Sequence, residues 1–339
     1  MIPDLSKLDT ATKLLFSIEL QPLQGERFQP TGFPSLGAAT YESKHGANLL
    51  VESAQSMANR LETVCWDEPS NQPRAELAGL SYVRVERRGK YLTSSMTEAH
   101  RINSPYLLAG SDKTFLNKIT EELAVFESGP IDRKLLAKVL LKYDVGSLLH
   151  GVFLAKKELA GGRLRVARAL SAFIEAQAVR QAISGGVKND HVNPSGSTKE
   201  GFGNVPFSRE EFTAEKITLF VNLDLAQIRG YGLGKDIEQL LVLLALYKLR
   251  LLLDGDLRLR TACNLEVKDT TIFATKPAGF ALPSAADLAE GLAAAVTKAK
   301  DQMSSTTVIF NDELKKAKDA EEDSKDGGSE TPDEENAQP

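Results

Sequence analysis

The stretch NLLVESAQSMANRLETVCW, residues 48–66, decides the architecture that this sequence predicts. Its apolar residues recur at i, i+3, i+4 and i+7, which is the spacing of an amphipathic helix. A helix N-terminus offers unpaired N–H groups and a partial positive charge, so this start suits an anion such as phosphate, although a capped surface helix explains the same pattern. Polar side chains fill the first two turns: Ser53, Gln55, Ser56, Asn59 and Arg60.

Length and composition exclude several classes of protein. The 339 residues allow roughly two domains, and a hydrophobic content of 42% is enough for a core. No apolar run approaches the ~20 residues of a membrane-spanning helix, and the start MIPDLSKLDTATK lacks the basic and apolar regions of a signal peptide. Cys65 and Cys263 form no C-x-x-C pair, so neither a disulfide framework nor a zinc site is expected. We therefore expect a cytoplasmic protein with no membrane partner.

The formal net charge of −5 hides a segregation of charge along the chain. Residues 319–339 hold nine acids against Lys325, a net of −8, so the rest of the chain carries +3. Between Arg133 and Lys188 there are eleven Lys or Arg residues and three acids, a local net of +8. A basic body with an acidic tail suits the binding of a polyanion better than the total charge suggests.

Periodicity and turn signals predict a mixture of strands and helices. Strands are expected over residues 12–23, 80–86, 148–155, 163–179, 217–228 and 256–267, although the second half of 163–179 fits a helix equally well. Helices are expected within residues 48–66, 94–101, 112–126, 131–143, 236–253 and 284–303. Residues 27–41 are rich in Gly and Pro and predict a long irregular loop. After residue 312 the chain is charged and free of aromatics, which is typical of disorder.

Residues 185–212 (GGVKNDHVNPSGSTKEGFGNVPFSREEF) contain five glycines and two prolines. The segment is too long and too weakly apolar for a compact connection, and loops of this length are usually functional or disordered. Because strand-like segments flank it, the sequence predicts a protruding hairpin.

No motif for catalysis, metal binding or nucleotide binding is found. The patterns H-E-x-x-H, G-x-x-x-x-G-K-[ST], G-x-G-x-x-G and G-x-S-x-G are all missing from the sequence, and no cofactor is expected. His150 has apolar neighbours and is interpreted as a core histidine. What remains is a set of Arg, Lys, Gln, Ser and aromatic residues on loops, strand faces and a helix start, a distribution typical of proteins that hold single-stranded nucleic acid.

Several stretches carry a resemblance to a known family. They are RFQPTGFPSLGAATY (27–41), LVESAQSMANRLETVCW (50–66), TEAHRINSPY (97–106), GGVKNDHVNPSGSTKEGFGNVPF (185–207) and LDLAQIRGYGLG (223–234). In these stretches the chain resembles the CRISPR-associated RAMP proteins of the Cas7-like GSU0053 type, which form the Cascade backbone in type I-U (also called I-G) systems. The resemblance covers most of residues 10–310.

The resemblance implies an α+β fold with a modified RRM-like (ferredoxin-like) core and large insertions. On that basis residues 1–311 form an RRM-like palm with inserted finger or helical segments at about 28–147. A thumb hairpin at about 183–212 protrudes from the palm, and residues 312–339 form an acidic disordered tail. The implied function is a non-catalytic subunit that polymerises along guide crRNA and grips its phosphate backbone independently of sequence, for recognition of target DNA in antiviral defence.

The resemblance also implies partners and an RNA-binding site. The partners are the guide crRNA, the target DNA strand paired to it, copies of the chain in a helical filament, and other Cascade subunits. In related subunits a helix start rich in Ser-x-Gln-Ser binds the RNA backbone, and residues 53–56 match it. The RNA-binding candidates are Arg27, Gln29, Ser53, Gln55, Ser56, Asn59, Arg60, His100, Arg101, Arg165, Arg168, Lys188, His191, Phe207 and Arg209.

Two other functions fit the sequence. In the first, the chain is a metal-independent RAMP endoribonuclease that processes CRISPR repeat RNA, with His100 or His191 as the general base. In the second, it is an α/β enzyme acting on a small molecule, which a closed pocket with perturbed ionisable groups would favour. Type III relatives cut RNA with a loop Asp, and Asp190 in the predicted hairpin is the residue to consider for such a role.

Overall fold

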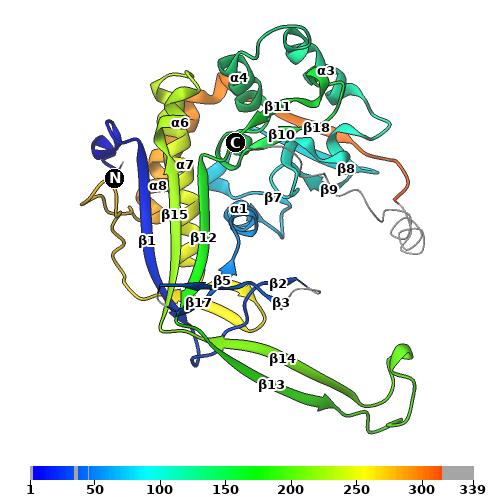
Figure 1. Ribbon diagram of the computed structural model, residues 1–339. Helices are drawn as coiled ribbons and strands as arrows, with labels where there is room; N and C mark the ends of the chain where they lie inside the picture. The colour runs from blue at the N-terminus through cyan, green and yellow to red at the C-terminus, as the bar shows by residue number, and fades with distance from the viewer. Residues whose placement is uncertain (1–2, 34–36, 45, 315–339) are drawn as a thin grey trace, which may run out of the picture.

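A computed structural model describes residues 3–33, 37–44 and 46–314. Its centre is a seven-stranded sheet in the order β16-β17-β1-β15-β12-β5-β4, in which all neighbours are antiparallel (Figure 1). The predicted α+β class is therefore confirmed. From residue 315 on, the predicted acidic tail lies outside the described residues. The strands of this sheet are β1 (Lys13–Pro22), β4 (Thr40–Ser43), β5 (Gly46–Glu52), β12 (Leu170–Gln177), β15 (Lys216–Asp224), β16 (Leu257–Arg260) and β17 (Cys263–Val267).

Helices α7 (Lys235–Asp254) and α8 (Ala285–Ala299) cover one face of this sheet (Figure 1). Along β1 every second side chain, from Leu14 to Leu20, is buried, as the two-residue period of a strand with one covered face requires. Helix α7 is apolar almost all round and is buried for most of its length, which explains why the sequence predicts it so clearly. In the described part of the chain no helix has both the length and the hydrophobicity needed to cross a bilayer.

Residues 48–63 form the end of a strand followed by a helix. Residues 48–52 belong to β5, where Leu49 and Val51 are fully buried, so the prediction of a helix from residue 48 was wrong. Helix α1 (Ala54–Thr63) begins after Ser53, whose side chain accepts a hydrogen bond from the Ser56 N–H at 3.2 Å. The boundary was misplaced because Leu50 and Val51 fit the 3.6-residue period of a helix and an apolar strand equally well.

The chain between α1 and β12 forms a lobe beside the upper end of the sheet (Figure 1). Strand β18 (Ser305–Ile309) returns to this lobe and pairs in parallel with β8. Its helices are α2 (Pro105–Leu108), α3 (Thr114–Leu123), α4 (Arg133–Tyr143) and α5 (Gly146–His150). Its strands are β6 (Trp66–Asp67), β7 (Gln72–Pro73), β8 (Tyr82–Arg87), β9 (Lys90–Ser94), β10 (Val152–Leu154) and β11 (Leu164–Val166).

Five predicted elements differ from the structure. Two predicted strands, 163–179 and 256–267, each divide into two: β11 with β12, and β16 with β17. Residues 94–100 form no helix, because the side chains of Ser94 and Thr97 bond to each other and to the local backbone and so compete with helical pairing. A short 3-10 helix begins only at Arg101 (Arg101–Asn103). Residues 148–155 are divided between α5 and β10, and Gly151, at φ +76°, separates them. The strand predicted at 217–228 ends at Asp224, which caps α6 (Leu225–Gly230) by accepting from the Gln227 N–H at 2.9 Å.

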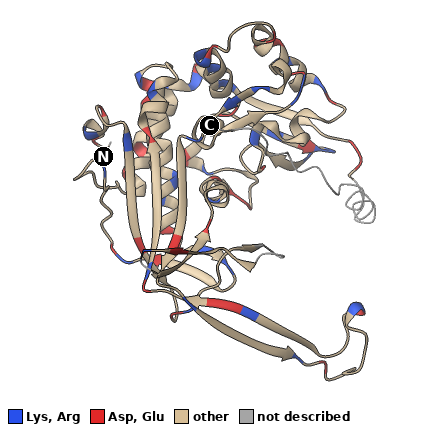
Figure 2. Ribbon diagram, in the orientation of Figure 1, with Lys and Arg blue, Asp and Glu red and all other residues tan. Residues whose placement is uncertain are grey.

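Strands β13 (Arg180–Lys188) and β14 (Val205–Thr213) form the predicted hairpin, which projects from the lower end of the sheet (Figure 1). Most of its side chains are exposed, including Ile183 at 76% and Phe207 at 49%. Figure 2 shows acidic and basic segments side by side on β14. The loop predicted over 27–41 also contains short strands, β2 (Gly32–Phe33) and β3 (Gly37–Ala38).

Candidate nucleic-acid interface

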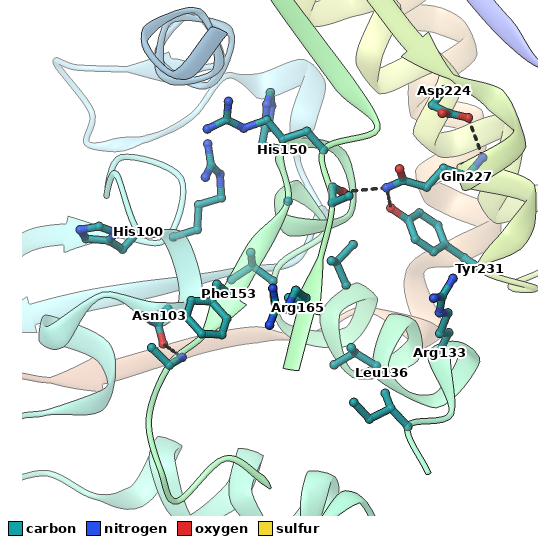
Figure 3. A pocket seen from close by; sticks show the side chains of 18 of the residues that line it. His100, Asn103, Arg133, Leu136, His150, Phe153, Arg165, Asp224, Gln227 and Tyr231 are labelled. Atoms are coloured by element: carbon teal, nitrogen blue, oxygen red, sulfur yellow. Dashed lines mark hydrogen bonds between the residues drawn. The ribbon is translucent and has the colours of Figure 1, made fainter. Parts of the chain in front are cut away.

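A cavity of about 1440 Å³ opens between the lobe and the upper end of the central sheet (Figure 3). We call it the basic groove. Six segments contribute to its wall: the start of α1, residues 99–103, the start of α4, the segment from α5 through β10, residues 163–168 and helix α6. It brings together five of the predicted site residues: Gln55, His100, Arg101, Arg165 and Arg168.

Positive side chains dominate the lining of this groove. Five arginines and His100 line it, whereas Asp224 is the one carboxylate among the lining residues that the structure describes. Asp224 forms an ion pair with Lys13 at 2.9 Å, so its charge is already compensated. The arginines are Arg101, Arg133, Arg163, Arg165 and Arg168. Such a surface attracts a polyanion and repels a cationic ligand.

Arg168 is the half-buried cation of the groove that lacks an anionic partner. Within the described chain its guanidinium makes no hydrogen bond or ion pair. Burial, followed by the charge of Arg101, lowers the pKa of Arg168, and Glu62 opposes that effect only in part. A bound anion would remove this penalty, because an opposite charge within a few ångströms favours the charged form.

Arg101 is held by a buried ion pair and is not free to move. Its Nε and Nη2 atoms donate to the two carboxylate oxygens of Glu62, both at 2.7 Å, and each side chain is less than a tenth exposed. Burial raises the pKa of Glu62, whereas Arg101 and then Lys248 lower it. This bidentate contact fixes Arg101 beneath the groove, where it contributes charge and shape.

His150 is buried, as the sequence indicated, but its hydrogen bonding is not fully satisfied within the described residues. It lies against the groove wall at the end of α5, and its Nδ1 has no partner in the described structure. Its Nε2 lies 3.1 Å from the Nζ atom of Lys248. An ammonium group can only donate, so Nε2 accepts and the hydrogen of the neutral ring lies on Nδ1. Burial, then Lys248, lowers the pKa of His150 well below its usual range.

The segment that carries Arg165 and Arg168 is fixed from the opposite wall. Gln227 on α6 donates its side-chain N–H to the carbonyl oxygen of Ala167 at 2.7 Å and to the hydroxyl of Tyr231 at 2.7 Å (Figure 3). Tyr231 in turn donates to the carbonyl oxygen of Leu148 at 2.7 Å. These bonds hold the chain around residue 167 while the two arginine side chains remain unbonded.

The polar residues at the start of α1 fall into two groups. Gln55 and Asn59 are exposed, and Gln55 reaches the groove. Ser53 caps the helix, and the Ser56 hydroxyl donates to the buried carboxylate of Glu52. Ser53 and Ser56 therefore have an observed structural role, as a helix cap and as a partner of Glu52.

Arg60 ties α1 to β16 in this structure. Its Nε donates to Glu52 at 3.0 Å and its Nη2 to the carbonyl oxygen of Leu259 at 2.6 Å. A third bond, from Nη1 to the carbonyl oxygen of Arg258, measures 3.3 Å. With its donors used in this way, Arg60 stabilises the helix position, and RNA contact by Arg60 stays a prediction.

The remaining predicted residues lie away from the basic groove. Arg27 pairs with Glu211 at 3.1 Å at the base of the hairpin, and the Gln29 carbonyl oxygen accepts from Arg260 at 2.8 Å. Lys188, His191, Phe207 and Arg209 are exposed on the hairpin or its end, which Figure 1 shows projecting from the opposite end of the sheet. On the hairpin, Arg209 lies over the ring of Phe207, 5.8 Å from its centroid.

Asp190 organises the end of the hairpin. Its carboxylate accepts hydrogen bonds from the N–H groups of Val192, Asn193 and Gly203 at 2.9–3.0 Å. These backbone donors, that of Asn193 first, lower the pKa of Asp190. Among the described residues no cluster of His, Cys, Asp and Glu is arranged to hold a metal ion.

Three groove residues were not predicted from the sequence: Arg133, Arg163 and Phe153. The first two lie in the basic region 133–188, so the local charge was the available signal. Arg163 donates to the carbonyl oxygens of Phe126 and Gly129 and thereby ties the chain before β11 to residues 126–129. Phe153 lies in the strand predicted over 148–155, and the sequence did not indicate that it is 50% exposed at the groove.

Comparison with known proteins identifies the family. Residues 14–181 match the family described as CRISPR-associated protein GSU0053. No curated protein matches the chain. A chain of a CRISPR RNA-guided surveillance complex in a pre-nicking state shares 14% identity and a TM-score of 0.37 with it, over 70% of this chain and 72% of that one.

Csc2 from Thermofilum pendens shares 12% identity and a TM-score of 0.32, over 89% of this chain and 79% of that one. Both TM-scores lie below 0.5, so the two structures are only distantly similar to this chain. The family match agrees with the resemblance read from the sequence motifs, and the chain belongs to the CRISPR-associated protein GSU0053 family.

Proposed function

We propose that this chain is a non-catalytic backbone subunit of Cascade that binds guide crRNA along its phosphate backbone. The observation that carries the proposal is the basic groove, in which Arg133, Arg165 and Arg168 make no hydrogen bond or ion pair within the described chain. Unbonded guanidinium groups on a fixed frame suit phosphates, and they contact every sequence alike. The membership of the GSU0053 family supports the same function.

The topology supports an RRM-like palm. Strand β1, helix α1, strands β12 and β15, helix α7 and strand β17 follow one another along the chain as β-α-β-β-α-β. In the sheet these four strands stand in the order β17-β1-β15-β12, which is the antiparallel arrangement that such a split β-α-β pair produces. On this basis the lobe is an insertion between α1 and β12, and the hairpin β13–β14 is an insertion between β12 and β15.

We assign the hairpin the role of a thumb that contacts the guide and a neighbouring copy of the chain. Ile183, Val187, Phe202 and Phe207 are all at least 48% exposed on a hairpin that projects from the sheet. An isolated two-stranded hairpin is marginally stable in water, so contact with a partner would stabilise it. A filament of such copies would present the guide to a complementary target DNA strand and to other Cascade subunits.

RNA binding by an Arg165→Ala/Arg168→Ala variant tests the proposal. Fluorescence anisotropy with labelled single-stranded RNA of unrelated sequences is measured between 50 and ~300 mM salt. Because each phosphate contact on a single strand contributes ~0.7 to the salt slope, the double variant should lose about 1.4 from it and weaken equally for all sequences. Arg88→Ala, in the exposed turn between β8 and β9, removes a cation outside the groove and should leave the slope unchanged. An unchanged slope in the double variant would remove the groove from the RNA site.

The endoribonuclease function remains the alternative. His100 is exposed at the groove and His191 is exposed near the end of the hairpin, so the two lie on separate parts of the molecule. Purified protein incubated with CRISPR repeat RNA decides the question. Cleavage that His100→Ala or His191→Ala abolishes would establish the enzyme, and intact RNA with the unaltered chain would exclude it.

A further inference from the structure

Phe153 presents an aromatic ring to the basic groove. The side chain is 50% exposed, and it lies on the groove wall beside Asn103 and Arg165 (Figure 3). Arg165 is its cross-strand partner in the ribbon of β10 and β11, and the guanidinium carbon of Arg165 lies 5.5 Å from the ring centroid. The groove therefore combines phosphate-binding cations with one exposed aromatic face.

The fold holds this ring outward. In the two-stranded ribbon the neighbouring Leu154 and Leu164 are fully buried, so strand alternation turns Phe153 and Arg165 to the other face. The Ala155 N–H donates to Asn103 Oδ1 at 3.1 Å and fixes one end of β10.

Gly151 fixes the other end of β10. It adopts φ +76°, and a Cβ atom there would meet the carbonyl oxygen of Val166 at 2.8 Å. The close approach of backbone at this point keeps β10 tight against β11. The aromatic ring is consequently presented on a rigid element and not on a loose loop.

The chemistry of this surface fits a nucleobase. A base stacks on an aromatic ring whatever its identity, and an adjacent guanidinium can stack on the base or bind its phosphate. The volume of about 1440 Å³ exceeds the 300–1,000 Å³ typical of small-molecule pockets, so there is room for a base together with its flanking phosphates. An apolar protein segment would satisfy Phe153 but would leave Arg133, Arg165 and Arg168 without anions.

We propose that Phe153 is a stacking platform for one unstacked nucleobase of the bound RNA, while Arg165 and Arg168 hold the flanking phosphates. This inference rests on the proposed RNA-binding function and adds a base contact to it. The contact is independent of base identity, so it is compatible with a guide of any sequence. It makes the groove a site for a whole nucleotide.

The test compares intact RNA with an abasic oligoribonucleotide of the same length. Phe153→Ala should weaken binding of intact RNA by about 5- to 150-fold, which corresponds to the ~1–3 kcal/mol of base–aromatic stacking, and should leave the abasic strand unaffected. Arg168→Ala should weaken both. Phe153→Tyr should retain the affinity of the unaltered chain, and Phe273→Ala, which removes another exposed ring at 57% exposure outside the groove, should change neither.

The outcomes separate this inference from the proposed function. If the unaltered chain binds both strands and Phe153→Ala binds them equally well, the platform is refuted while RNA binding stands. If the unaltered chain binds neither strand, the proposed function itself fails. Scanning the RNA with 2-aminopurine adds a direct signal, because stacking on Phe153 should quench one position and Phe153→Ala should restore its fluorescence.

Discussion

Glu62→Gln should destabilise the protein strongly, because it removes the charge that compensates Arg101 beneath the groove. The pair is bidentate, with both N–O distances at 2.7 Å, and its side chains are 8% and 4% exposed. Lys248 is also buried close by, and its charge acts on Glu62. After the substitution two cations remain in a region that water reaches poorly, and Asp144 is the buried carboxyl group left to offset them.

The magnitude follows from burial. Breaking a buried ion pair by removing one partner costs ~3–5 kcal/mol, because the remaining charge is left uncompensated. A folded domain is stable by ~5–15 kcal/mol, so the loss is about a fifth or more of the total. Glutamine keeps the shape of the side chain and an oxygen that can accept from Arg101, so the charge is the main change. The lower end of the range is therefore the expected value.

Equilibrium unfolding in guanidinium chloride, followed by circular dichroism, measures the effect as a shift in midpoint. Glu19→Gln is the matched control, because Glu19 is 34% exposed and pairs with Lys268 at 2.5 Å on the surface. Surface pairs contribute ~0.2–1 kcal/mol, so this control should move the midpoint little. A midpoint for Glu62→Gln that equals that of Glu19→Gln would refute the view that the Arg101–Glu62 pair supports the groove from below.

Two further predictions concern pH and the start of α1. Burial raises the pKa of Asp144 to about 7, so the folded chain holds this proton where the unfolded chain, with a pKa near 3.8, has released it. The free energy of unfolding should therefore fall as pH rises from about 4 to 7. In Asp144→Asn the melting temperature should fall less over this pH range, and an equal fall in the variant and the unaltered chain would contradict the prediction. Ser53→Ala removes the α1 cap and should cost about 1 kcal/mol in urea unfolding, whereas Ser70→Ala, in an exposed turn, should cost less than half as much.

The elements with one strong period were predictable from the sequence. Strand β1, helix α7, helix α8 and the hairpin β13–β14 all lie where hydrophobic periodicity and turn residues placed them. The errors occurred where two local signals compete. At residues 48–52 a strand runs directly into α1, and at residues 94–101 hydroxyl groups take the hydrogen bonds that a helix needs.

The site was less predictable than the fold, because it depends on contacts between distant segments. The sequence offers no sign that Arg60 would bond to Glu52 and to the backbone of β16, almost 200 residues away. Nor can a three-residue strand such as β10 show which of its faces is exposed, so the sequence did not indicate that Phe153 faces the groove. Three groove residues were predictable from local sequence: Gln55 lies in a polar helix start, and Arg165 and Arg168 lie in a basic segment.

The structure divides the arginines near the groove into two kinds, and this division is more informative than their number. Arg101 and Arg163 use their donors on Glu62 and on backbone carbonyls, so they hold the groove in shape. Arg133, Arg165 and Arg168 make no hydrogen bond or ion pair within the described chain, so their donors remain for a ligand. Replacing a bonded arginine should therefore act mainly through stability, whereas replacing an unbonded one should act through affinity and its salt dependence. The two effects are separable by measuring unfolding and RNA binding on the same variants.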